Sequence, residues 1–157
     1  MSERHYWDTC AWIDLINEPA APIGPMRTMW GSVERGGLEV LFSPITLAEC
    51  LFRADGEERP YTDPHPSDEL FDASGVIPVQ VDRVIGEAAR SLRRRHNLST
   101  PDAIHVACAA EYSVTQLVTR DGSVLTKLPR LYCKDGSVLV ISTPREALGG
   151  PLFQGRN

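Results

Sequence analysis

The chain has 157 residues, enough for one domain with a substantial buried core. Its composition is 42% hydrophobic and 24% charged, as in ordinary globular proteins, and no run approaches the roughly 18–20 apolar residues of a membrane helix. The N-terminal segment lacks the apolar run and cleavage site of a secretory signal, so we expect a cytoplasmic protein without a membrane anchor. The net charge of −5 has the wrong sign for bulk electrostatic binding to nucleic acid, unless a cation neutralises clustered acids.

The four cysteines are far apart and form no CxxC pair, which argues against a zinc ribbon. They are Cys10, Cys50, Cys108 and Cys133. Together with the alternating pattern of strands and helices described next, this spacing favours reduced, buried thiols over disulfides.

The first part of the chain alternates short strands with helices. Residues 4–7 predict a strand that ends at Asp8, and a helix follows as far as Ile16. A second helix is expected over residues 26–35, closed by two glycines. The apolar run 38–42, bounded by glycine and Ser-Pro, predicts the second strand.

The middle of the chain is less regular. Thr46 can cap a third helix, which would place Glu49 near its first turn. Residues 53–75 are rich in proline, glycine and acids and predict a loop with one short helix at 66–71. Its effect on substrate entry or dimer contacts stays open. Residues 76–81 predict the third strand.

The last part resumes the alternation. Asp82 can cap an amphipathic helix through His96, and Thr100 can cap an alanine-rich helix that continues to Tyr112. The remaining elements are a strand at 116–119, a short helix at 124–128 and a strand at 138–141. Short apolar strands that alternate with helices predict an α/β fold with a parallel sheet covered on both faces.

Four acids fall at strand ends or helix starts: Asp8, Glu49, Asp102 and Asp121. In a parallel sheet such positions gather at one edge, beyond the carboxyl ends of the strands. Each acid alone is more simply a helix cap, but four placed alike indicate a shared site. Crowded ionised carboxylates need a cation, and Mg²⁺ prefers hard oxygen ligands and keeps water molecules that can attack a phosphodiester.

Four segments carry a resemblance to a known family: YWDTCAWIDLI, ITLAECLF, STPDAIHVACAAE and LVTRDGSVLTKL. In order and approximate spacing they resemble the four acidic motifs of PIN domains, and most closely those of VapC-like toxins of bacterial toxin–antitoxin pairs. The resemblance implies a three-layer PIN-like nuclease domain over residues 1–145, followed by a C-terminal tail at 146–157. It also implies a central parallel five-stranded sheet in the order 3-2-1-4-5.

The resemblance further implies an Mg²⁺- or Mn²⁺-dependent endoribonuclease that dimerises and is inhibited by a cognate antitoxin. Carried over by motif, Asp8 and Asp102 would bind the metal directly. Glu49 and Asp121 would bind it directly, bind through water, or orient the attacking water. Gly122 follows Asp121 where many relatives carry another polar or acidic residue, so the number of metals stays open.

Some neighbouring residues have two interpretations. The hydroxyls of Thr9 and Thr119 could contact metal-bound water or a phosphate, or equally a nearby backbone group. His105 lies three residues after Asp102, on nearly the same helix face, and a packing or supporting role is favoured over contact with RNA.

The one concentrated basic run in the sequence is Arg90, Arg93, Arg94 and Arg95. A solvated helix face is the simpler interpretation, and contact with RNA phosphates at the rim of the groove is the sharper one. Arg120, next to Asp121, is a second candidate for such a contact.

Other classes of protein remain as alternatives. A PIN-like module could bind RNA or protein without cutting, although none of the four acids is missing. A phosphoacceptor receiver domain would need paired acids early in the chain, but Asp8 has no acidic neighbour, and Lys127 and Lys134 are poorly placed for its lysine. A haloacid-dehalogenase-type phosphatase would need DxDxT where this chain has DTCAW, and no glycine-rich phosphate loop follows the first strand.

Overall fold

A central sheet organises the computed structural model, which describes residues 2–50, 68–150 and 152–154. Its strands are β1 (Glu3–Trp7), β2 (Leu38–Phe42), β3 (Val76–Pro78), β4 (Gln116–Val118), β5 (Leu131–Tyr132) and β6 (Val138–Ser142). They lie in the order β3-β2-β1-β4-β6-β5. The parallel strands β3, β2, β1, β4 and β6 reproduce the predicted order 3-2-1-4-5.

Two features of the sheet differ from the prediction. A sixth strand, β5, pairs antiparallel with β6 at the edge, and its two residues are too short to give a sequence pattern. The third strand ends at Pro78 instead of residue 81. The last ladder bond runs from Val79 N to Phe42 O (2.8 Å), and β2 itself ends at Phe42, so the chain has no partner strand beyond this point.

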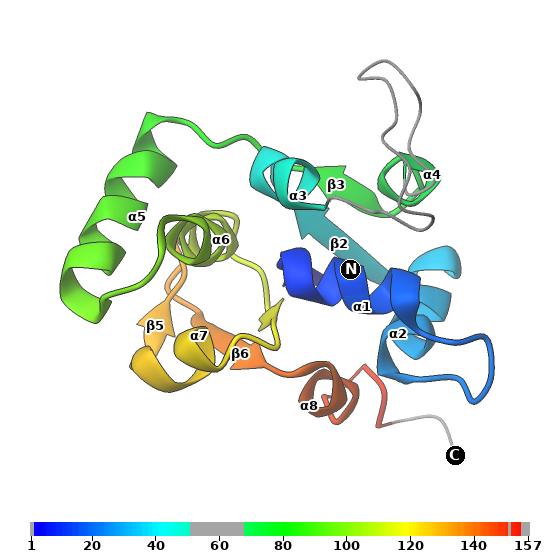
Figure 1. Ribbon diagram of the computed structural model, residues 1–157. Helices are drawn as coiled ribbons and strands as arrows, with labels where there is room; N and C mark the ends of the chain where they lie inside the picture. Colours follow the sequence, from blue (N-terminus) through cyan, green and yellow to red (C-terminus); the bar gives the residue numbers. More distant parts are fainter. Residues whose placement is uncertain (1, 51–67, 151, 155–157) are drawn as a thin grey trace.

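Helices cover both faces of the sheet, which makes three layers (Figure 1). They are α1 (Thr9–Asn17), α2 (Pro25–Glu34), α3 (Pro44–Glu49), α4 (Asp68–Phe71), α5 (Arg83–His96), α6 (Thr100–Glu111), α7 (Gly122–Lys127) and α8 (Pro144–Leu148). One layer contains α1, α2, α4 and α8, and the opposite layer contains α5, α6 and α7. Helix α3 bridges the layers, since it contacts both α1 and α6. Of the predicted short helix at 66–71, residues 66 and 67 lie outside the described residues.

Alternation along the strands divides the core in two. Tyr6 and Leu117 point to the layer of α5 and α6, whereas their neighbours Trp7 and Val118 point to the layer of α1 and α2. Trp12 of α1 packs among aromatic rings on the second side, with ring centroids 4.7–6.2 Å away. The alanine-rich α6 packs closely on the first side. These two cores hold α1 and α6 at fixed positions beside the central strands.

Two helix starts differ from the sequence prediction. Helix α3 begins at Pro44 after Ser43, so Glu49 lies in its last turn and not in its first. Thr46, the predicted cap, is instead fully buried inside the helix. Helix α6 is capped by Ser99 and not by Thr100, because Ser99 Oγ accepts a hydrogen bond from the backbone N–H of Asp102 at 3.2 Å.

The C-terminal part of the described chain packs against the domain. Helix α8 contacts α2, β4 and β6, and its Ala147 is fully buried. The predicted boundary between residues 145 and 146 falls inside this helix. All four cysteines are free thiols, three of them buried. Among the described residues, no helix is long and apolar enough to cross a membrane.

Candidate active site

Asp8 stands where β1 ends and α1 begins. Its backbone N–H donates to Val118 O (3.2 Å), which extends the pairing of β1 with β4 by one bond. Its side chain caps α1, with Oδ1 accepting from Ala11 N at 3.0 Å. Asp8 is only 4% exposed. Sheet and helix therefore fix this carboxylate in a buried position at the carboxyl edge of the sheet.

The electrostatics around Asp8 oppose its charge. Its pKa is raised to about 6, first by burial and also by the carboxylates of Asp102 and Asp121, while hydrogen bonds from Thr119 and Ala11 act to lower it. At neutral pH the group is still ionised, which places a buried negative charge beside two others. None of these three acids forms an ion pair with a residue that the structure describes.

Asp102 is held in the first turn of α6 by the residue that caps the helix. Ser99 Oγ donates to Asp102 Oδ2 at 2.7 Å and accepts from Asp102 N at 3.2 Å. The side chain is partly exposed. Ser99 thus fixes both the start of the helix and the direction of the carboxylate, a role that its place before Thr-Pro did not reveal in the sequence.

Asp121 is linked to Asp8 through Thr119. The fully buried Thr119 hydroxyl accepts from Asp121 N at 2.9 Å and forms a hydrogen bond with Asp8. Asp121 Oδ1 accepts from Ser123 N (2.8 Å) and so caps α7. Burial works to raise the pKa of Asp121, but the hydrogen bonds from Ser123 outweigh it and hold the pKa below its ordinary value.

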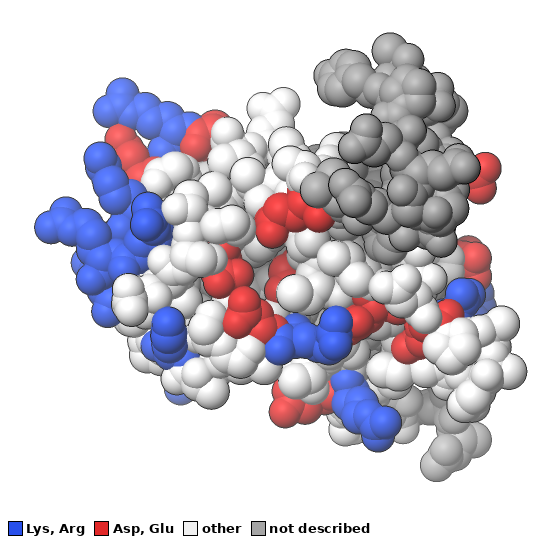
Figure 2. All heavy atoms as spheres, in the orientation of Figure 1, with Lys and Arg blue, Asp and Glu red and all other residues white. Residues whose placement is uncertain are grey.

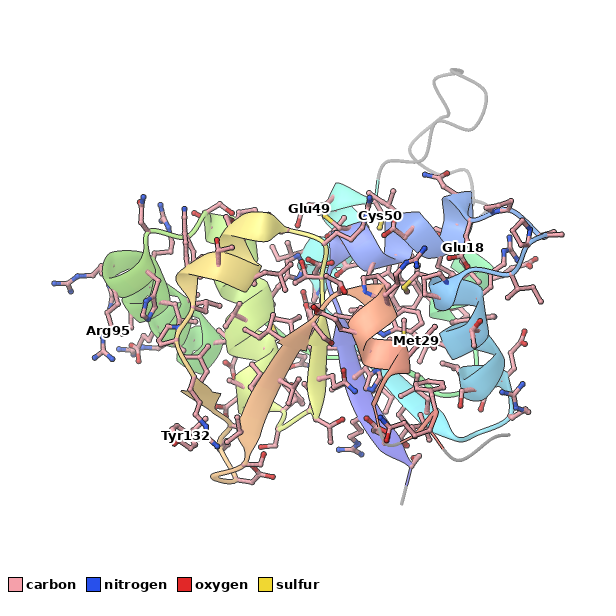
Figure 3. The ribbon with its side chains drawn as sticks, turned by 90° about the horizontal axis from the view of Figure 1, so that it is seen from below. Glu18, Met29, Glu49, Cys50, Arg95 and Tyr132 are labelled. Carbon is pink, nitrogen blue, oxygen red and sulfur yellow. The ribbon has the colours of Figure 1, made fainter. Side chains whose placement is uncertain are left out.

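Glu49 lies at the end of α3 (Figure 3). It is the most exposed of the four acids. Its Oε1 accepts from Thr9 Oγ1 at 3.3 Å and lies 3.2 Å from His105 Nε2. Nδ1 of His105 lies 2.8 Å from the Tyr6 hydroxyl, which is also within hydrogen-bond distance of Ser43 Oγ (2.9 Å). A buried chain of polar groups therefore runs from Glu49 into the core.

His105 is the helix residue for which the sequence favoured a supporting role. Burial lowers its pKa, while Glu49 and Asp102 act in the opposite direction. It is a buried neighbour of Glu49 and is only 4% exposed. Tyr6 and Ser43, its partners further in, gave no sequence signal, since a tyrosine in a buried strand is indistinguishable from ordinary core.

The structure brings three predicted acids together and places the fourth beside them. Asp102 and Asp121 both act to raise the pKa of Asp8, and Asp102 acts to lower the pKa of Asp121. Glu49 joins the group through Thr9, the neighbour of Asp8. Figure 2 shows acidic side chains gathered around a hollow near the centre of this face. We call Asp8, Asp102 and Asp121 the acid cluster.

A magnesium ion fits this set of donors. Within the part of the chain that the structure describes, no three Asp, Glu, His or Cys side chains already stand close enough to hold a metal ion. Mg²⁺ requires fewer protein ligands, because it is commonly bound by one or two carboxylates and keeps several waters. The uncompensated charge of buried Asp8 is what such an ion would offset.

The basic residues near the site are arranged differently from the acids. Arg120, a predicted phosphate contact, forms an ion pair with the partly buried Asp14 of α1. Arg93 and Arg94 are exposed on α5. Figure 3 shows Arg95, on the same helix, projecting outward and away from Glu49.

These features define a class of protein: a three-layer α/β domain with acids at the carboxyl edge of a parallel sheet, where α/β folds place their functional crevice. The sequence profile of the PIN domain family matches residues 6–131. The chain therefore belongs to the PIN domain family. No curated protein sequence matches it.

Solved structures share this fold. A toxin–antitoxin complex from Klebsiella pneumoniae has a TM-score of 0.59 at 20% identity, covering 89% of this chain and 97% of that chain. VapBC2 from Rickettsia felis, bound to a DNA fragment from its promoter, has a TM-score of 0.63 at 13% identity, covering 89% and 98%. FitAB bound to the IR36 DNA fragment has a TM-score of 0.52 at 17% identity, covering 89% and 94%.

Proposed function

We propose that this PIN domain is an Mg²⁺-dependent endoribonuclease that hydrolyses RNA phosphodiester bonds, with Mn²⁺ able to replace Mg²⁺. The observation that carries the proposal is the buried, ionised Asp8 beside Asp102 and Asp121, with no cation among the described residues to offset it. A protein tolerates such an arrangement at a cost in stability, so the arrangement indicates a ligand that carries positive charge.

Asp8 and Asp102 would hold the metal directly, and Asp121 would hold it directly or through water. A bound Mg²⁺ supplies a water of lowered pKa and offsets the charge that develops on the phosphate. Ala11 N and Ser99 Oγ keep the two direct ligands oriented before the metal arrives. Glu49, held through Oε1, would orient the attacking water.

Cleavage of a structured RNA mixture tests the proposal. Purified wild type is compared with Asp8→Asn and Asp102→Asn in Mg²⁺, Mn²⁺ or EDTA. Glu111→Gln is the matched control, because Glu111 lies on the same helix as Asp102 but at its other end, paired with Lys134. We expect discrete fragments that require metal, disappear in both acid variants and persist in the control.

Two other outcomes would contradict the proposal. Cleavage that persists in both acid variants would mean that the site is assigned wrongly. RNA that stays intact with metal-loaded wild type would favour the alternative, a catalytically silent PIN-fold module that binds RNA or protein.

We further propose that the protein is a toxin held inactive by a cognate antitoxin, acting in the cytoplasm as a homodimer. The support is that two solved structures with this fold are a toxin–antitoxin complex from Klebsiella pneumoniae and VapBC2 from Rickettsia felis. Expression in a bacterium should arrest growth, the antitoxin should relieve the arrest, and Asp8→Asn should be harmless. Arrest by Asp8→Asn would contradict the toxin proposal, and a monomer in light scattering would contradict the dimer.

A further inference from the structure

We propose that the exposed side of α5 is a separate docking surface for the phosphate backbone of single-stranded RNA. The surface consists of Arg90, Arg93, Arg94 and Arg95, and we call it the arginine face. The proposal rests on the proposed function only for the identity of the polyanion. It assigns the arginines a binding role and no part in the chemistry.

Unpaired positive charge is distributed unevenly over the described residues. Four cationic side chains outside the arginine face form ion pairs, namely Arg4–Glu39, Arg83–Glu87, Arg120–Asp14 and Lys134–Glu111. The other described cations are scattered over several elements: Arg27, Arg35, Lys127, Arg130 and Arg145. None of the four residues of the arginine face forms an ion pair with a residue that the structure describes. In a chain of net charge −5, free positive charge is thus concentrated on one helix, as Figure 2 shows over α5.

The stability of helix α5 does not account for all four arginines. Arg93 to Arg95 lie in the last turn of α5, where the helix dipole favours cations. Arg90 lies a turn earlier and gains little from the dipole. It also stands four residues before Arg94, and like charges at this spacing destabilise a helix. An anion between the two guanidinium groups would reverse the sign of that interaction.

The arginine face also has a shape that suits a phosphate. Arg90, Arg94 and Arg95 line a hollow of about 490 Å³ together with Glu87 and Ser91. The hollow is open to solvent, and Glu87 is already engaged by Arg83 (2.8 Å). Guanidinium groups that surround an open hollow can bind a phosphate with paired N–H donors.

The arginine face is connected to the acid cluster through the turn between α5 and α6. Residues 97–99 form a short turn that joins the basic end of α5 to the start of α6, where Asp102 lies. Lys127 of α7 donates to Asn97 O (3.1 Å), so a further cation stands at this turn. Helix α7 itself begins directly after Asp121. The acid cluster repels phosphates, whereas Lys127 and the arginine face attract them. An RNA strand that lies over the acid cluster can therefore continue past Lys127 to the arginine face.

Salt-dependent binding tests the proposal without cleavage. The Asp8→Asn protein, in EDTA, is titrated into a fluorescently labelled oligouridine between about 50 and 200 mM salt. Arg90→Gln and Arg94→Gln are introduced singly and together. Arg35→Gln is the matched control, because Arg35 is an exposed arginine at the end of α2, next to the amino edge of the sheet.

We expect each α5 substitution to weaken binding several-fold at low salt and to reduce the slope of log affinity against log salt by about 0.7. In the double variant the slope should fall by about twice as much, and the melting temperature should not change. Arg35→Gln should bind with the affinity and slope of the Asp8→Asn protein. Unchanged affinity and slope in the double variant would overturn the proposal and favour an acidic protein partner for this helix. If wild type fails to cleave RNA but these slopes change as expected, the surface stands and the nuclease proposal fails.

Discussion

His105 Nε2 lies 3.2 Å from Glu49 Oε1, while its Nδ1 lies 2.8 Å from the Tyr6 hydroxyl. The ring thus connects the buried centre of β1 to the acid at the end of α3. Because Thr9 donates to the same Oε1, Glu49 is held from two sides although its side chain is 37% exposed. An exposed glutamate would otherwise sample many rotamers, so this arrangement is expected to preorganise it.

We therefore predict that His105→Ala lowers the rate of RNA cleavage at saturating metal more than it changes the KM for RNA. His105→Gln can place an amide donor near the position of Nε2 and should restore part of the rate. The measurement is steady-state kinetics of the two variants beside wild type. A drop in melting temperature with unchanged kcat in both variants would show that the histidine only supports packing.

Tyr6→Phe removes the hydroxyl between His105 and Ser43. Because both partners are buried and lose a hydrogen bond, we expect a loss of about 1–3 kcal/mol in the free energy of unfolding. Urea denaturation measures it. A neutral effect would mean that Ser43 and His105 find other partners.

The two helix caps Ser99 and Thr143 provide a matched pair. Ser99 caps α6 and also bonds to the Asp102 carboxylate, whereas Thr143 caps α8 in a capping box with Glu146. Each change to alanine should cost about 1 kcal/mol of stability. Only Ser99→Ala should also reduce cleavage and weaken metal binding, because only it frees Asp102, a proposed metal ligand. Equal losses of activity would contradict this role for Ser99.

Much of this fold could be predicted because its patterns are local. Most strands and helices follow from apolar runs and turn residues, and the structure confirms the α/β class. The order of the parallel strands was implied by the resemblance to PIN domains, and the structure has that order. The antiparallel β5 could not be predicted, because two residues carry no period. Glu49 was misplaced by most of a helix, since Ser43-Pro44 and Thr46 are both plausible helix starts and only burial of Thr46 decides between them.

The site was predictable to the extent that strand ends imply a location. Asp8, Asp102 and Asp121 could be assigned to one edge from their positions alone. The residues that orient them could not, because a hydroxyl such as Thr119 or Ser99 bonds equally well to backbone in many loops. Arg120 shows the same limit, since its ion pair with Asp14 joins α1 to the segment after β4 and depends on the tertiary structure.

Asp8 should make the metal-free protein less stable as pH rises. Its folded pKa of about 6 exceeds the ordinary value of 3.8, so the folded state holds this proton more tightly than the unfolded state. The resulting stability is complete below pH 3.8 and is lost as pH rises towards 6, up to about 3 kcal/mol. Asp8→Asn carries no charge at this position and should escape the loss.

The measurement is urea denaturation of both proteins in EDTA at acidic and neutral pH. The free energy of unfolding of Asp8→Asn should increase relative to that of wild type between about pH 4 and 7. Glu111→Gln should show no such increase. A stability difference between wild type and Asp8→Asn that is the same at acidic and neutral pH would contradict the idea that this charge is uncompensated.

Calorimetric titration of Mn²⁺ into the metal-free protein tests the proposed metal site. We propose that Asp8, at the end of β1, and Asp102, at the start of α6, hold a catalytic cation. We expect saturable binding by wild type and Glu111→Gln, and loss of that binding in Asp8→Asn and in Asp102→Asn. Binding of equal affinity in all four proteins would place the metal elsewhere and contradict the claim.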